Sequence, residues 1–192
     1  SEEERHEMIR IIYDESQRMG RLVTDLLDLA RMEAGHITLY KETVPIVLVL
    51  ERMTQKFMQV AKEKHVHLQF VSELLDDIMI SVDEDRIEQV LTNLIDNAIR
   101  HTPQDGTVTV SLTNEFSYAK ISVSDTGVGI PKEDLPYVFE RFYKADKART
   151  RSKGGTGLGL AIARNIVEAH GGNIKVDSVE KEGTSFTFYL PM

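Results

Sequence analysis

A glycine-rich run, GGTGLGLAIARNIVEAHGG at residues 154–172, restricts the possible folds more than any other part of the sequence. A glycine-rich loop that opens a helix surrounds an anion with backbone N–H groups, and the helix dipole assists. The spacing does not fit a P-loop, because no lysine follows the last glycine. It does not fit a Rossmann turn either, because Gly155, Gly157 and Gly159 form G-x-G-x-G late in the chain. The run therefore predicts an anion-binding loop of another kind.

Positive charge is concentrated directly before this run. The 192 residues carry a formal net charge of −8, which argues against general nucleic-acid binding. Residues 141–153 instead hold six basic residues against Asp146 alone, a local balance of +5. A solvated surface loop is the alternative, but the neighbouring anion-binding loop favours attraction of a phosphate group. The basic residues are Arg141, Lys144, Lys147, Arg149, Arg151 and Lys153.

The composition is typical of a soluble globular protein with one domain and an appendage, since 41% of residues are hydrophobic and 28% are charged. The absence of cysteine excludes disulfides and thiolate metal sites, and it fits a reducing compartment. We find no apolar run long enough to span a bilayer and no signal-peptide pattern.

Residues 4–33 are predicted to form one helix, which would be about 45 Å long. Its apolar residues recur at intervals of three and four, the spacing of a packed helical seam, and Gly35 follows at a C-cap position. No neighbouring segment is long enough to cover this face, so we expect a further helix or a second chain to pair with it. The seam consists of Ile12, Met19, Leu22, Leu26 and Leu29, widened by Ile9, Val23, Leu27 and Ala30.

The remainder is predicted to be one α/β domain. The expected elements are helices at 45–64, at 83–101 and after the glycine run, a hairpin of strands at 106–114 and 118–125, and further strands at 36–44, 66–72, 77–82, 173–178 and 184–190. Residues 126–154 are expected to be mostly irregular, with a short helical piece after Pro131. A loop of that length inside a compact domain is usually functional or disordered.

The helix at 83–101 carries a polar stripe beside its apolar one. Asn93, Asn97 and His101 recur at intervals of four, so they share one face of the helix. Taken alone, two such asparagines are more often caps for neighbouring backbone. A carboxamide oxygen is also a good ligand for a hard cation such as Mg²⁺, and both interpretations stay open at this point.

The segment SDTGVGIP at 124–131 follows an expected strand. Gly127 and Gly129 allow a flat ligand to approach the backbone, and the Asp125 carboxylate can accept a hydrogen bond from an exocyclic amine such as that of adenine. A plain Asp-Thr-Gly turn is the alternative. In the following segment, FERFYKAD, the aromatic residues Phe139, Phe142 and Tyr143 form either local core or an anchor for a mobile lid.

The order of these motifs resembles the catalytic domain of bacterial sensor histidine kinases, in the superfamily that includes gyrase-type ATPases and heat-shock chaperones. NLIDNAIRHT is similar to the N box, DTGVGI to the first glycine box, FERFYKAD to the F box and GGTGLGLAIA to the second glycine box. GTSFTFYLP is similar to the closing strand, and the resemblance covers residues 45–192. ESQRMGRLVTDLLDLARMEAG resembles the second helix of the dimerisation and phosphoacceptor domain of those kinases.

The resemblance implies an α+β fold, a two-layer α/β sandwich with a mixed sheet that holds ATP under a flexible lid. It implies a phosphoacceptor-domain helix at 1–35 and an ATP-binding domain at 36–192. In this relation Asn97 is the Mg²⁺ ligand, and Arg141 or a lid lysine stabilises the transferred phosphoryl group. The nucleotide-binding residues that it implies are Asn93, Asn97, Arg100, His101, Asp125, Gly127, Gly129, Gly155, Thr156, Gly157, Leu158, Gly159 and Thr184.

Asn93 bears on the choice between kinase and hydrolase. In the hydrolytic relatives of this fold, a glutamate one turn before the metal-binding asparagine activates water, and the matching position here resembles Asn93. A carboxamide cannot act as a general base at neutral pH. ATP is then held for a nucleophile brought from elsewhere, which suits a kinase. An ATP-driven conformational machine and a non-catalytic nucleotide-binding module remain as alternatives.

The nucleophile expected from the resemblance is a histidine in a segment like S-H-E-L-R-T-P. None of the six histidines has that context, so the chain is expected to be a fragment that lacks its phosphoacceptor. The partners implied are the phosphoacceptor helix of the same kinase, a response regulator and a second copy paired through residues 4–33. The region is expected to be cytoplasmic, in a longer protein anchored in the bacterial membrane.

Overall fold

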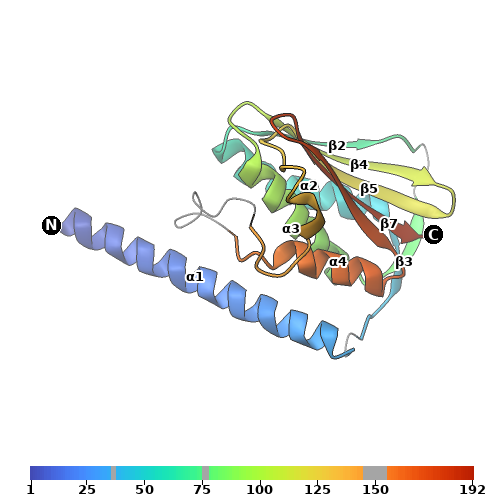
Figure 1. The fold of residues 1–192 in the computed structure, drawn as a ribbon, viewed down its shortest axis with the longest axis horizontal. Coiled ribbons are helices and arrows are strands. Elements are labelled where there is room, and N and C mark those ends of the chain that lie inside the picture. The colour runs from blue at the N-terminus through green and yellow to red at the C-terminus, as the bar shows by residue number, and fades with distance from the viewer. Residues whose placement is uncertain (36–37, 75–77, 145–154) are drawn as a thin grey trace.

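The computed structural model describes residues 1–35, 38–74, 78–144 and 155–192. The domain has two layers, a twisted sheet and a layer of helices on one of its faces, and one long helix projects away from it (Figure 1). The helices are α1 (Glu2–Glu33), α2 (Ile46–Glu63), α3 (Glu84–His101) and α4 (Gly159–Ala169), with a 3-10 turn, η1, at Leu135–Tyr137. The strands are β1 (Glu42–Pro45), β2 (His67–Ser72), β3 (Met79–Val82), β4 (Thr107–Glu115), β5 (Tyr118–Asp125), β6 (Asn173–Val179) and β7 (Gly183–Pro191).

Within the described residues, the strands form a five-stranded sheet of order β2-β4-β5-β7-β6 and a two-stranded sheet of β1 and β3. β2 runs parallel to β4, whereas the β4–β5, β5–β7 and β6–β7 pairs are antiparallel. The sheet is therefore mixed, and the predicted α+β class is confirmed. The register places Asp125 opposite Thr184 on β7, which brings two predicted site residues together.

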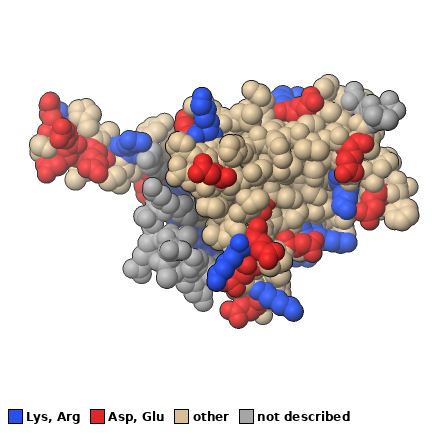
Figure 2. All heavy atoms as spheres, turned by 90° about the horizontal axis from the view of Figure 1, so that it is seen from above, with Lys and Arg blue, Asp and Glu red and all other residues tan. Residues whose placement is uncertain are grey.

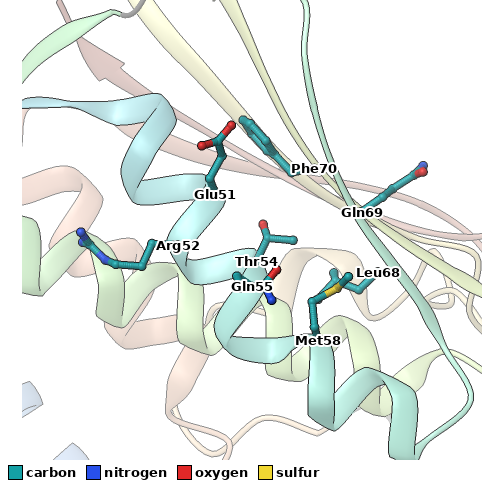
Figure 3. Close-up of a pocket in the computed structure, with 8 residues that line it drawn as sticks. All are labelled: Glu51, Arg52, Thr54, Gln55, Met58, Leu68, Gln69 and Phe70. Atoms are coloured by element: carbon teal, nitrogen blue, oxygen red, sulfur yellow. The ribbon is translucent and has the colours of Figure 1, made fainter.

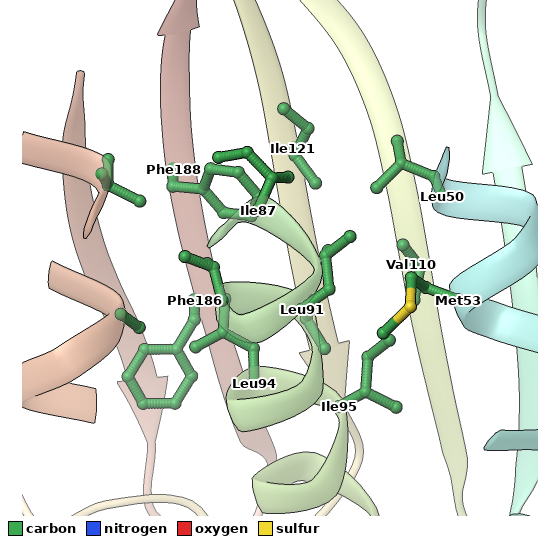
Figure 4. Packing of buried hydrophobic residues seen from close by; sticks show 14 of the residues in the cluster. Leu50, Met53, Ile87, Leu91, Leu94, Ile95, Val110, Ile121, Phe186 and Phe188 are labelled. Carbon is green, nitrogen blue, oxygen red and sulfur yellow. The ribbon is translucent and has the colours of Figure 1, made fainter. Parts of the chain in front are cut away.

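The core lies between the sheet and the helices. α3 is central in this layer, with α4 on one side and α2 on the other, and its apolar stripe faces the strands (Figure 4). The spacing of that stripe explains why α3 is helical, because residues three and four apart share one face. Its fully buried members are Ile87, Val90, Leu91, Leu94, Ile95, Ala98 and Ile99. This central position makes α3 the element from which the site is built.

The opposite face of the sheet carries small hydroxyl side chains. Ser122 bonds Thr187 and Ser124 bonds Ser185, each oxygen pair at 2.8 Å. Figure 2 shows the molecule turned to this side, with its centre largely free of charged side chains and acidic ones gathered at the far end of α1. Among the residues that the structure describes, no helix has the length and apolar character needed to cross a membrane.

α1 begins with a capping box between Ser1 and Glu4, and Gly35 follows it with φ +71. Part of the apolar face that was expected to need another helix or chain packs on the domain of the same chain. Leu29 is 3% exposed, because it packs on the domain of the same chain together with Met32. Leu22 is partly buried against the same core. Part of the predicted seam is therefore already covered, whereas other members, Met19 and Leu27 among them, are exposed.

Two further expectations need adjustment. The strand expected at 36–44 is shorter and later, as β1 occupies Glu42–Pro45. Residues 38–41 are irregular, and Tyr40 donates its N–H to the Asp83 side chain rather than to a strand. The irregular region after β5 holds η1 beyond Pro131, as predicted, and its residues 145–154 lie outside the described part of the chain.

Candidate nucleotide-binding site

The polar stripe of α3 faces the start of α4. Nδ2 of Asn93 donates a hydrogen bond to the Gly159 carbonyl oxygen at 3.0 Å. A methyl group added to Gly159 would lie 3.3 Å from the Asn93 carboxamide, a tight contact that would push this side chain away by a few tenths of an ångström. Asn97 lies one turn further along α3 and is half-buried. The structure thus brings Asn93, one member of the polar stripe, into contact with the glycine-rich run.

Arg100 extends this contact by one further turn. Its guanidinium pairs with Asp96 on the same helix and lies against Gly155, where an added methyl group would collide with it. A fixed positive charge therefore stands beside the glycine run. Such a charge, together with the N-terminus of α4, favours an anion at this place.

The glycine run is held in shape from two sides. Gly157 has φ +76, and its carbonyl oxygen accepts a hydrogen bond from the Phe142 N–H at 2.9 Å. Phe142 itself has φ +59, an unusual conformation for a side chain of this size. The Thr156 hydroxyl oxygen accepts a hydrogen bond from the Leu158 N–H at 3.3 Å, just before α4 begins. Backbone bonds to the F-box segment thus fix the turn that leads into the helix.

The first glycine box packs against the C-terminal end of α3, next to Arg100. A methyl group on Gly127 would collide with the carbonyl oxygen of His101, and that oxygen accepts the Val128 N–H at 3.4 Å. Asp125 is 8% exposed, and its Oδ1 accepts the Gly127 N–H at 2.8 Å. Burial raises the pKa of Asp125, while hydrogen bonds from the Gly127 and Thr184 backbone act in the opposite direction. α3 therefore connects the two glycine boxes.

The turn between β6 and β7 supports the first glycine box from behind. Gly129 has φ +70 and lies so close to Val179 that a side chain there would collide. The Ile130 N–H donates to Oγ of Ser178 at 2.8 Å, and Oγ of Ser178 lies 2.9 Å from Oγ1 of Thr184. Thr184 is therefore beside Asp125 in the sheet, with its hydroxyl bonded to Ser178.

The F box joins the loop to the sheet. Phe139 packs edge-on against Phe186 of β7, with ring centroids 6.0 Å apart. Tyr143 donates a hydrogen bond to Asp134, which raises the pKa of Tyr143 to about 12. Arg141 is exposed, and Phe142 is 56% exposed. Lys144 is half-buried, whereas Asp146, Lys147, Arg149, Arg151 and Lys153 lie outside the described residues.

A residue that the sequence reasoning did not find completes the surroundings of the glycine run. Oγ1 of Thr156 donates to Oδ2 of Asp25, on α1, at 3.1 Å. Asp28, one turn further along, accepts hydrogen bonds from Arg86 at 3.3 Å and from Gln89 at 3.2 Å. An acidic residue on a long helix gives no sequence signal for such contacts, because they join positions more than fifty residues apart.

The side chains around the glycine run suit a metal ion that is coordinated mainly by a bound ligand rather than by protein groups. In the described part of the chain, no three His, Asp or Glu side chains are grouped so as to hold a metal ion. The carboxamide oxygens of α3 are of the kind that Mg²⁺ accepts when most of its other ligands are phosphate oxygens and water. A separate cavity of about 500 Å³ lies between α2 and β2, and none of its lining residues belongs to these motifs (Figure 3).

Comparisons with protein families match both parts of the chain. Residues 82–192 match the family described as histidine kinase-, DNA gyrase B- and HSP90-like ATPase. Residues 1–35 match the family described as His Kinase A (phospho-acceptor) domain.

Known proteins of similar sequence and structure point the same way. The sensor histidine kinase WalK of Bacillus subtilis (strain 168) is 45% identical over 186 residues, which are 95% of this chain and 30% of WalK. Full-length ShkA in complex with AMPPNP has a TM-score of 0.84 at 28% identity, covering 98% of this chain and 39% of ShkA. The histidine kinase ThkA in complex with the response regulator protein TrrA has a TM-score of 0.75 at 25% identity, covering 96% of this chain and 50% of ThkA. This chain thus spans less than a third of WalK.

Proposed function

Because the chain belongs to the family of histidine kinase-, DNA gyrase B- and HSP90-like ATPases, we propose that it is the catalytic region of a sensor histidine kinase. It binds ATP and transfers the γ-phosphoryl group to a histidine on a dimerisation domain. The observation that carries this proposal is the contact of α3 with the glycine run, in which Asn93 meets Gly159 and Arg100 meets Gly155. A polar helix face is thereby in direct contact with an anion-binding loop. AMPPNP in the complex of the similar ShkA agrees with a nucleotide here.

Each part of the site has a role in holding the nucleotide. The Asp125 carboxylate accepts from the exocyclic amine of adenine, with Gly127, Gly129 and Thr184 shaping the base pocket. The triphosphate lies along the glycine run, where backbone N–H groups and the α4 N-terminus favour negative charge. The further phosphate-side residues are Asn93, Asn97, Arg100, His101, Gly155, Thr156, Gly157, Leu158 and Gly159.

Phosphoryl transfer requires correct positioning of the reacting groups and stabilisation of the phosphate charge. A histidine ring nitrogen attacks the γ-phosphorus, the bond from that phosphorus to the β–γ bridging oxygen breaks, and ADP leaves with the electron pair. Asn97 would hold Mg²⁺, and the ion would supply positive charge that offsets the negative charge of the phosphates. Arg141 or a lysine of the basic segment stabilises the charge of the transferred group. Asn93 holds the loop through Gly159 and cannot take a proton from water, so hydrolysis is slow.

The acceptor histidine comes from outside the chain. Residues 1–35 are the second helix of a dimerisation and phosphoacceptor domain, and residues 36–192 are the ATP-binding domain. The exposed apolar residues of α1, among them Ile12, Met19 and Leu27, support pairing with further helices, both of the same kinase and of a second copy. A response regulator then receives the phosphoryl group, as the complex of the similar ThkA with TrrA suggests. The full protein is anchored in the membrane with this region in the cytoplasm.

The test is transfer from γ-labelled ATP, with the chain alone and with an added dimerisation domain that carries a histidine. We expect acid-labile label on the added domain and none on the chain. Asn97→Ala should abolish transfer, while Asn114→Ala, the same change at an exposed position on β4, should leave it intact. Label on the chain's own histidines would contradict the proposal, and ATP turnover without any acceptor would favour a conformational ATPase. Nucleotide binding without transfer would favour a binding module.

A further inference from the structure

α1 contacts the domain through one face near its C-terminal end. Leu29 and Met32 are buried against the core, and Asp28 bonds Arg86 and Gln89 of α3. Asp25, one turn earlier, accepts the hydrogen bond from Thr156 in the glycine run. α1 therefore does more than precede the domain in the chain, because it also packs on the domain. It places a carboxylate at the loop that is proposed to hold the triphosphate (Figure 1 shows α1 passing along α4).

The Thr156 hydroxyl has one proton to donate. In this structure that proton goes to Asp25, while the hydroxyl oxygen accepts from the Leu158 N–H. A phosphate oxygen can accept this hydrogen bond only if the hydrogen bond from Thr156 to Asp25 is broken. The Asp25 carboxylate and a phosphate group are both negatively charged and both lie at the N-terminus of α4. Each therefore weakens the binding of the other. Partial burial raises the pKa of Asp25, so the carboxylate already bears a cost for its charge.

The contact of α1 with the domain also depends on whether the apolar residues of α1 are paired with another helix. Leu22 and Leu29 belong to the predicted seam for helix pairing, and both pack on the domain. One side chain cannot fill a helical seam and the domain surface at the same time. The docked position of α1 therefore competes with seam formation at Leu29, as it competes with phosphate at Thr156.

We propose that α1 and the nucleotide triphosphate compete for the Thr156 hydroxyl, so that docking of Asp25 lowers nucleotide affinity and nucleotide binding releases α1 from the glycine run. The inference rests on the proposed function, because it needs the triphosphate at this loop. Asp25 is in these terms a positioning residue that acts through Thr156. Coupling between the two binding events is reciprocal, so it can be measured from either side.

The first experiment is calorimetry of Mg·AMPPNP binding to the complete chain and to Asp25→Ala and Asp25→Asn. Asp25→Ala removes both the charge and the acceptor, and it should tighten binding by about five- to tenfold. Asp25→Asn keeps an acceptor oxygen and removes only the charge, so its gain should be smaller. Glu15→Gln is the matched control, since it removes a carboxylate from a distant, exposed part of α1. Its affinity should equal that of the unchanged chain.

The second experiment is hydrogen exchange of α1 with and without Mg·AMPPNP. Nucleotide should speed exchange in residues 22–33 and leave residues 2–15 unaltered. Equal affinity for the chain and Asp25→Ala, or exchange in residues 22–33 that does not respond to nucleotide, overturns the competition while the proposed function stands. If neither the chain nor any variant binds Mg·AMPPNP, the proposed function fails, and the competition falls with it.

Discussion

The backbone N–H of Asp83 donates a hydrogen bond to Nε2 of His170 at 3.0 Å, which ties the start of α3 to the end of α4. Nδ1 of the same ring lies 2.8 Å from the Ile166 carbonyl oxygen and donates to it. His170 is therefore a neutral ring with a defined tautomer, and protonation of Nε2 would remove the acceptor. Burial is the main cause that lowers the pKa of His170 from 6.5, and the positive charge of Lys41 adds to it.

This contact predicts a pH dependence of stability. The folded state disfavours protonated His170, so its contribution is present above pH 6.5 and is lost as the pH falls through the lower pKa of the folded state. The free energy of unfolding should therefore decrease on acidification below neutrality. Denaturant titrations at several pH values measure it. His170→Gln, whose oxygen can still accept from Asp83, should lose less stability with acid, while the exposed-site control His67→Gln should behave as the unchanged chain. Equal slopes for all three would contradict the prediction.

Asp125→Asn should weaken nucleotide binding. The substitution replaces an acceptor-only carboxylate by an amide and removes a charge-assisted hydrogen bond, at a cost of about 1.5–3 kcal/mol. Calorimetry with Mg·ADP gives the affinity. Asp177→Asn makes the same change at an exposed position on β6 and should have no effect. Unchanged affinity of Asp125→Asn would remove this residue from the adenine site.

Asn93→Glu should raise ATP hydrolysis and lower phosphoryl transfer. The new carboxylate can accept a proton from water, and we expect roughly a tenfold rise, below the 10²–10⁴ that a well-positioned base contributes. The change also removes the hydrogen bond from Asn93 to the Gly159 carbonyl oxygen, at a cost of about 0.5–1.5 kcal/mol. Phosphate release in the absence of any acceptor is the measurement. Asn114→Glu serves as the control, and a hydrolysis rate unaffected by Asn93→Glu would refute the role.

Gly157→Ala and Gly20→Ala form a pair with opposite expected results. Gly157 has φ +76, and an added methyl group would lie 3.0 Å from the Phe142 backbone, so the change should cost about 1–2 kcal/mol and impair nucleotide binding. Gly20 lies within α1 with nothing within 4 Å of an added methyl group, so alanine should stabilise the helix by about 0.5–1 kcal/mol. Thermal unfolding and nucleotide affinity, measured for both variants, test the two predictions. A harmless Gly157→Ala would show that the turn tolerates another conformation.

Much of the fold follows from local patterns in the sequence. The period of α3, its Asp83 cap and the β4–β5 hairpin lie where the predictions put them, because helix and strand periodicity is a property of neighbouring residues. The stripe of Asn93 and Asn97 was likewise predictable as one helix face, since side chains four apart share a face.

The sequence by itself determined most of the elements, the mixed α+β class and the motif residues of α3, β5 and the glycine run, but not the position of β1. Only the tertiary structure decided that Asn93 bonds Gly159, that Arg100 lies against Gly155 and that Asp25 takes the Thr156 proton. It also decided that Leu29 packs against the domain of its own chain. The physical reason is range: periodicity is set by residues within one or two turns, whereas these contacts join positions far apart in the chain. Which of several apolar or polar partners a side chain meets then depends on how whole elements pack.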